Sequence, residues 1–144
     1  MLGESEGDAW PRRGEIDILE WSAQLYSRDE MQSALHTERL HGGSAKVARQ
    51  HLKDACGAFH TFKVLWTAER IGFGQDDGAI RTLATRPNNA DASVWPFNRD
   101  FRLILNVAVG GDLGGPPPNP GSVAEMEIQW IRVYPLTENL AHNR

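Results

Sequence analysis

The sequence contains a single cysteine, Cys56, so no disulfide can form within this chain. Cys56 matches no zinc-ligand spacing and lacks the neighbours of a catalytic nucleophile, so we expect it to have no functional role. Positive charge is not in excess either. The formal net charge is -4 at pH 7, which gives no electrostatic basis for binding nucleic acid.

Long apolar runs are also missing. No segment approaches the roughly 20 apolar residues of a membrane-spanning helix, so we expect no membrane association. The opening residues, MLGESEGDAW, are acidic and polar, and they do not have the apolar core of a signal peptide. A length of 144 residues suggests one domain, which we assign to residues 1–136, followed by a tail at residues 137–144.

Most segments that do show a pattern alternate with a period of two, as strands do. We expect strands at residues 31–37, 59–66, 101–111 and 124–134, and a hairpin that closes at Asp77 and Gly78. Residues 45–57 carry apolar side chains at helical spacing, which leaves a short helix and an ordered loop equally open. Residues 110–122 are too rich in Gly and Pro for a regular element. Short strands with Gly/Pro turns indicate an all-β sandwich.

The segment GEIDILE, residues 14–20, places three carboxylates within six residues. Residues two apart in a strand face the same side, so Glu15 and Asp17 share one face while Ile16 points into the core. Strict alternation would put Glu20 on the opposite face. A β-bulge at residues 18–19 makes two residues count as one and returns Glu20 to the carboxylate face.

Three carboxylates on one face suit the chemistry of a glycosidase. Two carboxyl groups about 5–5.5 Å apart are the apparatus of a retaining enzyme, in which one attacks the sugar and the other donates and accepts a proton. The charge of a third raises the pKa of its neighbours and helps to keep the acid protonated. Two other interpretations stay open on this pattern alone: a solvated strand face, and a calcium or magnesium site.

The segment WPRRGEIDILE resembles the catalytic strand of glycoside hydrolase family 16, whose pattern is Glu-x-Asp-x-(x)-Glu. The optional residue is present as Leu19, as in laminarinase-type β-1,3-glucanases. Four later segments agree in order, so that the resemblance runs from Met1 to about Tyr134: ALHT, FHTFKVLWTAERIGF, WPFNRDFRLILNVAVGG and MEIQWIRVY. The fold that it implies is a concanavalin-like β-jelly roll.

The resemblance also implies roles for five residues. Glu15 matches the nucleophile, Glu20 the acid/base and Asp17 the assisting carboxylate. Trp10 matches an aromatic residue that packs against a sugar ring, with a core tryptophan as the alternative. His36 matches a histidine on the neighbouring strand near the leaving group, with a structural histidine as the alternative.

The function that the resemblance implies is hydrolysis of β-1,3-glucan with retention, by an endo-acting enzyme without a cofactor. The alternatives are a non-catalytic β-glucan-binding protein and a family 16 enzyme that acts on agarose or carrageenan. We expect no metal, because Gln129 replaces an Asp that ligates calcium in many relatives. We expect a polysaccharide as the partner, a monomer, and a secreted or extracellular parent protein.

The same resemblance implies that the family's N-terminal strands are missing from this sequence. Its start, MLGE, is similar to the end of a family strand. A jelly roll without those strands has open sheet edges, so the chain alone is expected to be poorly packed and inactive or weakly active.

Overall fold

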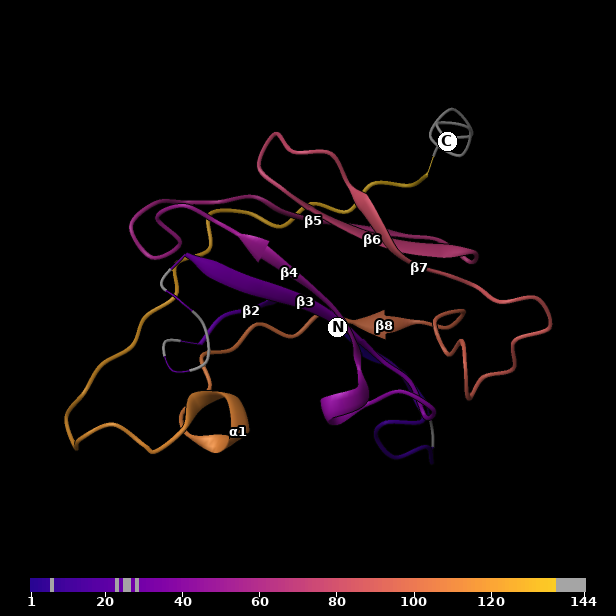
Figure 1. Cartoon of the computed structure of the whole chain (residues 1–144), viewed down its shortest axis with the longest axis horizontal. Helices are drawn as coiled ribbons and strands as arrows, with labels where there is room; N and C mark the ends of the chain where they lie inside the picture. The colour runs from indigo at the N-terminus through magenta and orange to yellow at the C-terminus, as the bar shows by residue number, and fades with distance from the viewer. Residues whose placement is uncertain (6, 23, 25–26, 28, 137–144) are drawn as a thin grey trace.

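The computed structural model describes residues 1–136 apart from residues 6, 23, 25–26 and 28. These residues form two antiparallel sheets (Figure 1). The first sheet has the strand order β4-β3-β2-β1-β8 and the second has the order β5-β6-β7. The bounds are β1 Leu2–Gly3, β2 Glu15–Glu20, β3 Glu30–His36, β4 Lys46–His51, β5 Phe62–Trp66, β6 Arg70–Gln75, β7 Arg81–Thr85 and β8 Phe101–Arg102. The expectation of an all-β sandwich is therefore confirmed.

The centre of the larger sheet is the pair β2 and β3. Glu15 lies opposite His36, and Asp17 lies opposite Ala34, but Glu20 lies opposite Gln32. Three residues of β2 are therefore matched by two residues of β3, and the register shifts between Asp17 and Glu20. This irregularity confirms the bulge that the spacing of the carboxylates predicts.

The hydrophobic core lies between the two sheets. Its buried members come from β2, β3, β6, β7 and the loop before β8: Ile16, Leu35, Ile71, Phe73, Ala84, Trp95 and Phe97. The indole N–H of Trp95 donates to the carbonyl of Ala68, and that of Trp66 donates to the carbonyl of Phe97. These bonds satisfy polar groups that would otherwise be buried without partners, and they hold the loop over the core.

Residues 45–57 are neither a helix nor a loop throughout, so both interpretations of this segment are wrong. Residues Lys46–His51 form β4, which pairs with β3 along its whole length, from Leu35 opposite Lys46 to Glu30 opposite His51. A short 3-10 turn at Gly42–Ser44 leads into the strand. Cys56 lies in the segment after β4 and is exposed.

The second sheet agrees with the predicted hairpin. Strands β6 and β7 are joined by a turn in which the Gly78 N–H donates to the Gln75 carbonyl, and Asp76 adopts a φ of 45°. The predicted strand at residues 59–66 is shorter than expected, because β5 begins at Phe62.

The predicted strands at residues 101–111 and 124–134 are wrong over most of their length. Only Phe101–Arg102 form a strand, β8, which pairs with β1. A four-residue helix, α1, follows at Gly111–Gly114 within the segment expected to be irregular. Figure 1 shows the orange-to-yellow chain after β8 as a trace without strand arrows, interrupted by α1. Trp130, within the second of these predicted strands, is 48% exposed.

The predicted tail, residues 137–144, lies outside the described residues, as does His142. Within the described part of the chain, no helix has the length and apolar character needed to cross a membrane.

Candidate active site

Strand β2 presents Glu15 and Asp17 on the face of the sheet opposite the core. Ile16 between them is fully buried in the core. The strand begins directly after Gly14, whose φ is +80° and where a Cβ would lie 2.7 Å from Pro96 Cγ. Both the backbone conformation and the lack of space therefore favour glycine at the entry to β2.

The bulge returns Glu20 to the same face. On β3, Gln32 and His36 are four residues apart and share a face by alternation. His36 contacts Asp17, and Gln32 donates a hydrogen bond of 2.8 Å to Glu20 Oε2. Glu20 and Asp17 thus face the same side, as the sequence predicts.

His36 forms an ion pair with Asp17. Its Nε2 lies 3.1 Å from Asp17 Oδ2, and the two side chains are only 13% and 15% exposed. The bond to Asp17 raises the pKa of His36, burial opposes this, and the charges of Glu15 and Glu20 add to the increase. The face is therefore more than a set of solvated acids, because it also holds a histidine whose pKa is raised by the carboxylate that it contacts.

Trp10 contacts the first carboxylate. Its indole Nε1 donates a 2.6 Å hydrogen bond to Glu15 Oε2. The ring packs against His36 and His41, with centroid separations of 5.9 and 5.6 Å, and remains 46% exposed. Trp10 is therefore not a core residue. It lies beside the carboxylates with surface left for a ligand.

The pKa of Glu20 is raised above its usual value. The main cause is burial, which penalises the charged form, while the bond from Gln32 lowers the pKa. The charges of Asp17 and Glu15 raise it further, and His36 lowers it. The sequence predicts an increase through neighbouring charge. The structure adds desolvation as the larger cause.

Glu15, Asp17 and His36 also bring potential metal ligands to within 4.8 Å of one another. The histidine is a poor ligand in this arrangement, because metal binding needs a neutral imidazole and Asp17 favours the protonated form. Asp17 Oδ2 is buried, lies 3.1 Å from His36 Nε2 and has no well-aligned hydrogen-bond donor. These groups therefore form a charge pair, and the same atoms are potential metal ligands.

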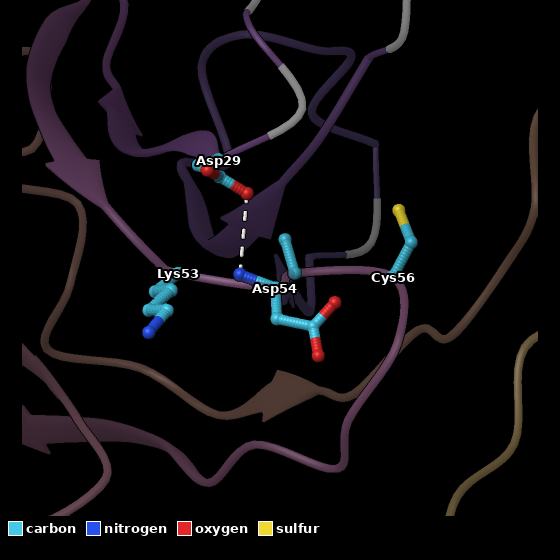
Figure 2. Close-up of a pocket in the computed structure, with 5 residues that line it drawn as sticks. Asp29, Lys53, Asp54 and Cys56 are labelled. Carbon is cyan, nitrogen blue, oxygen red and sulfur yellow. Dashed lines mark hydrogen bonds between the residues drawn. The ribbon is translucent and has the colours of Figure 1, made fainter.

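A separate pocket of about 410 Å³ is lined by Asp29, Lys53, Asp54, Ala55 and Cys56 (Figure 2). The Asp54 N–H donates to Asp29 Oδ1 at 3.2 Å across it. Figure 2 shows the Cys56 thiol pointing away from the Asp54 carboxylate. None of the five predicted site residues lines this pocket, and it offers no arrangement of a nucleophile and a base.

Sequence reasoning missed Gln32 as part of the site. A signal was available, because residues 36, 34 and 32, counted back in steps of two from His36, share the carboxylate face. Once the bulge is included, the same count places it opposite Glu20.

Comparison of the amino-acid sequence with known proteins identifies the family to which the chain belongs. The sequence profile described as Glycosyl hydrolases family 16 matches residues 1–132. The chain belongs to glycoside hydrolase family 16.

Curated relatives in this family include a "Beta-glucanase" of Rhodothermus marinus, 32% identical over 90% of this chain and 47% of its own length. A "Glucan endo-1,3-beta-glucosidase" of Cryptopygus antarcticus is 33% identical over 83% of this chain and 47% of its own length. This chain thus spans about half the length of the curated relatives it matches.

A solved structure, SCLam, described as a non-specific endo-beta-1,3(4)-glucanase from family GH16, superposes with a TM-score of 0.57 at 31% identity. The match covers 64% of this chain and 34% of that one. The family 16 jelly roll is therefore the fold to which the two sheets described above correspond.

Proposed function

We propose that this chain carries the catalytic carboxylates of a retaining endo-β-1,3-glucanase, which hydrolyses laminarin-type polysaccharides by double displacement. The observation that carries the proposal is the set of three carboxylates on one face of β2 and its bulge, with burial raising the pKa of Glu20. The Cryptopygus antarcticus relative, a glucan endo-1,3-beta-glucosidase, supports the β-1,3 linkage.

In the first step, Glu15 attacks the anomeric carbon as the glycosidic bond breaks, and protonated Glu20 transfers its proton to the leaving oxygen. The raised pKa of Glu20 suits the acid, because it increases the protonated fraction near neutral pH. The product of this step is a glycosyl ester on Glu15.

In the second step, water attacks the anomeric carbon on the face opposite its ester bond to Glu15. Glu20, now ionised, accepts the water's proton, and the carboxylate of Glu15 leaves. Two inversions give net retention.

The other site residues orient these two groups. Trp10 holds one oxygen of Glu15 and offers an exposed ring on which an apolar sugar face can stack. Asp17 and His36 form a charge pair beside both glutamates, so that His36 offsets part of the negative charge of the three acids. We also propose that the enzyme is secreted and acts as a monomer, on the strength of the resemblance.

The test is incubation with laminarin, with reducing ends, product sizes and the anomeric ratio followed together. Early release of oligosaccharides as the β-anomer, seen by proton NMR before mutarotation, is the expected result. Release of the α-anomer would contradict the assignment of Glu15 as a nucleophile.

A parallel panel of lichenan, agarose and carrageenan separates the substrates. Faster cleavage of agarose or carrageenan would replace the glucan specificity. Binding of laminarin without new reducing ends on any substrate would favour a glucan-binding protein instead.

A further inference from the structure

Gln32 faces Glu20 across the β2–β3 pair, at the residue where the bulge ends. Its side-chain Nε2 lies 2.8 Å from Glu20 Oε2. Gln32 is partly buried on a strand that pairs on both sides, with β2 and with β4. Its backbone is therefore fixed by two ladders, and its side chain reaches Glu20 from a rigid position.

The hydrogen bond from Gln32 to Glu20 differs in kind from the other interactions around Glu20, which act through charge. Asp17 and Glu15 on β2 act on Glu20 through their negative charge, and His36 on β3 acts through its positive charge. On β4, Arg49 is the register partner of Gln32. Gln32 itself carries no charge and acts on Glu20 by direct donation of a hydrogen bond.

We propose that Gln32 is a positioning residue for the acid/base, which holds Oε2 of Glu20 throughout the reaction so that Oε1 carries the proton. The inference rests on the proposed function, since it assigns a partner to the acid/base of that same site.

An amide suits this role because it does not titrate. When Glu20 is protonated on Oε1, Oε2 is the carbonyl oxygen and still accepts from Gln32. When Oε1 has given its proton to the leaving oxygen, Oε2 belongs to a carboxylate and accepts more strongly. The bond therefore persists through both steps and strengthens in the ionised form, which is why it lowers the pKa of Glu20 against the effect of burial.

The experiment replaces Gln32 by Met, which keeps the side-chain length and removes the donor. A matched control is Gln50→Met, since Gln50 on β4 donates a comparable, partly buried bond of 3.2 Å to Ser33 Oγ, a residue that neighbours Gln32 but points to the other face of β3. The titration of the Glu20 carboxyl carbon is followed by NMR with ¹³C-labelled glutamate, and Glu20→Gln assigns the resonance. The pH dependence of kcat/KM on laminarin is measured in parallel.

The expected result is a higher titration midpoint of Glu20 in Gln32→Met, with the alkaline limb of kcat/KM displaced in the same direction. Loss of positioning should lower kcat/KM at the optimum by about ten-fold. Gln50→Met should leave both the midpoint and the limb in place, even if it lowers the melting temperature. Should Gln32→Met fail to fold, Gln32→Asn, which keeps an amide but shortens its reach, is expected to give the same displacement.

An unchanged Glu20 midpoint in the folded Gln32 variants would overturn the inference. Equal displacement by Gln50→Met would do the same, because the effect would then belong to the sheet and not to the contact. The NMR titration needs no turnover. A wild-type chain that cleaves nothing would therefore count against the proposed function, while the titration still decides whether Gln32 controls Glu20.

Discussion

Replacing Asp17 by Asn tests the charge pair at the centre of the site. The change keeps the shape of the side chain and removes its charge. His36 then loses the partner that raises its pKa, and Glu20 loses a neighbouring negative charge. We expect the titration midpoint of His36 to fall, and the alkaline limb of hydrolysis to move to lower pH because the pKa of Glu20 falls.

The energy at stake follows from the geometry. Two unit charges separated by the 3.1 Å between His36 Nε2 and Asp17 Oδ2 attract by about 1.3 kcal/mol in bulk water and ~5 kcal/mol at an effective dielectric of 20. The side chains are 13% and 15% exposed, so the environment lies between these limits, and desolvation reduces the gain. We expect a coupling of about 2 kcal/mol, in the range of a hydrogen bond between charged groups.

A double-mutant cycle measures this coupling. Urea unfolding of the wild type, Asp17→Asn, His36→Gln and the double variant gives the pairwise energy free of most single-site effects. The pKa of His36 is higher in the folded protein than its unfolded value of about 6.5. The coupling should therefore be complete below the unfolded pKa, and it should be lost as the pH rises through the folded pKa.

The same samples contain an internal control. His60 Nδ1, just before β5, lies 2.9 Å from Asp76 Oδ2 in the turn between β6 and β7, and this bond raises the pKa of His60. Its NMR titration should be identical in the wild type and Asp17→Asn. A coupling that is the same at acidic and alkaline pH, or an unchanged His36 midpoint beside an unchanged His60 midpoint, would refute the charge pair.

Four further predictions follow from the same contacts. Glu15→Gln should lower kcat at least about a thousand-fold; azide with an activated glucoside should yield an inverted glycosyl azide from Glu15→Ala and a retained one from Glu20→Ala. The raised pKa of Glu20 means that its contribution to stability is present at low pH and lost as the pH rises through the folded value. Glu20→Gln should therefore raise the melting temperature more under alkaline than under acidic conditions, and equal gains would contradict this. Asp76→Asn should lower the free energy of unfolding at pH values below the pKa of His60 and have less effect above it, as measured by urea unfolding. EDTA should change neither the melting temperature nor the hydrolysis of laminarin, whereas a loss restored by calcium would indicate a metal site.

The carboxylate face was predictable because its geometry depends only on counting. Alternation fixes which side Glu15 and Asp17 face, and a single extra residue is enough to return Glu20 to them. The main cause of the raised pKa of Glu20 was harder to predict from the sequence. Neighbouring charge can be seen in a sequence, whereas desolvation depends on how the bulge and β3 cover the carboxyl group.

Strand β4 shows how pairing overrides a local pattern. Val47, His51, Leu52 and Ala55 fall at helical spacing, and residues 46–51, KVARQH, show no alternation of apolar and polar side chains that would predict a strand. Pairing with β3 from Leu35 to Glu30 stabilises an extended backbone here through a continuous ladder of hydrogen bonds. The tertiary pairing of a short segment can therefore override its local sequence pattern.

The segment after β8 shows the converse. Phe101 lies opposite Gly3 and Arg102 opposite Leu2, so in this antiparallel register no residue of β1 lies opposite the run that follows. Leu105 and Val109 are 49% and 67% exposed, and Val133 reaches 90%. Each large apolar side chain left in water forfeits about 1.5–3 kcal/mol, and strand-forming residues gain nothing from an extended backbone without a ladder to join. The nearly continuous apolar run at residues 101–111 and the alternation at residues 124–134 thus describe a capacity for pairing, and pairing needs a second strand. The carboxylates do not depend on that capacity, because β2 lies between β1 and β3, where both ladders are formed within the described chain.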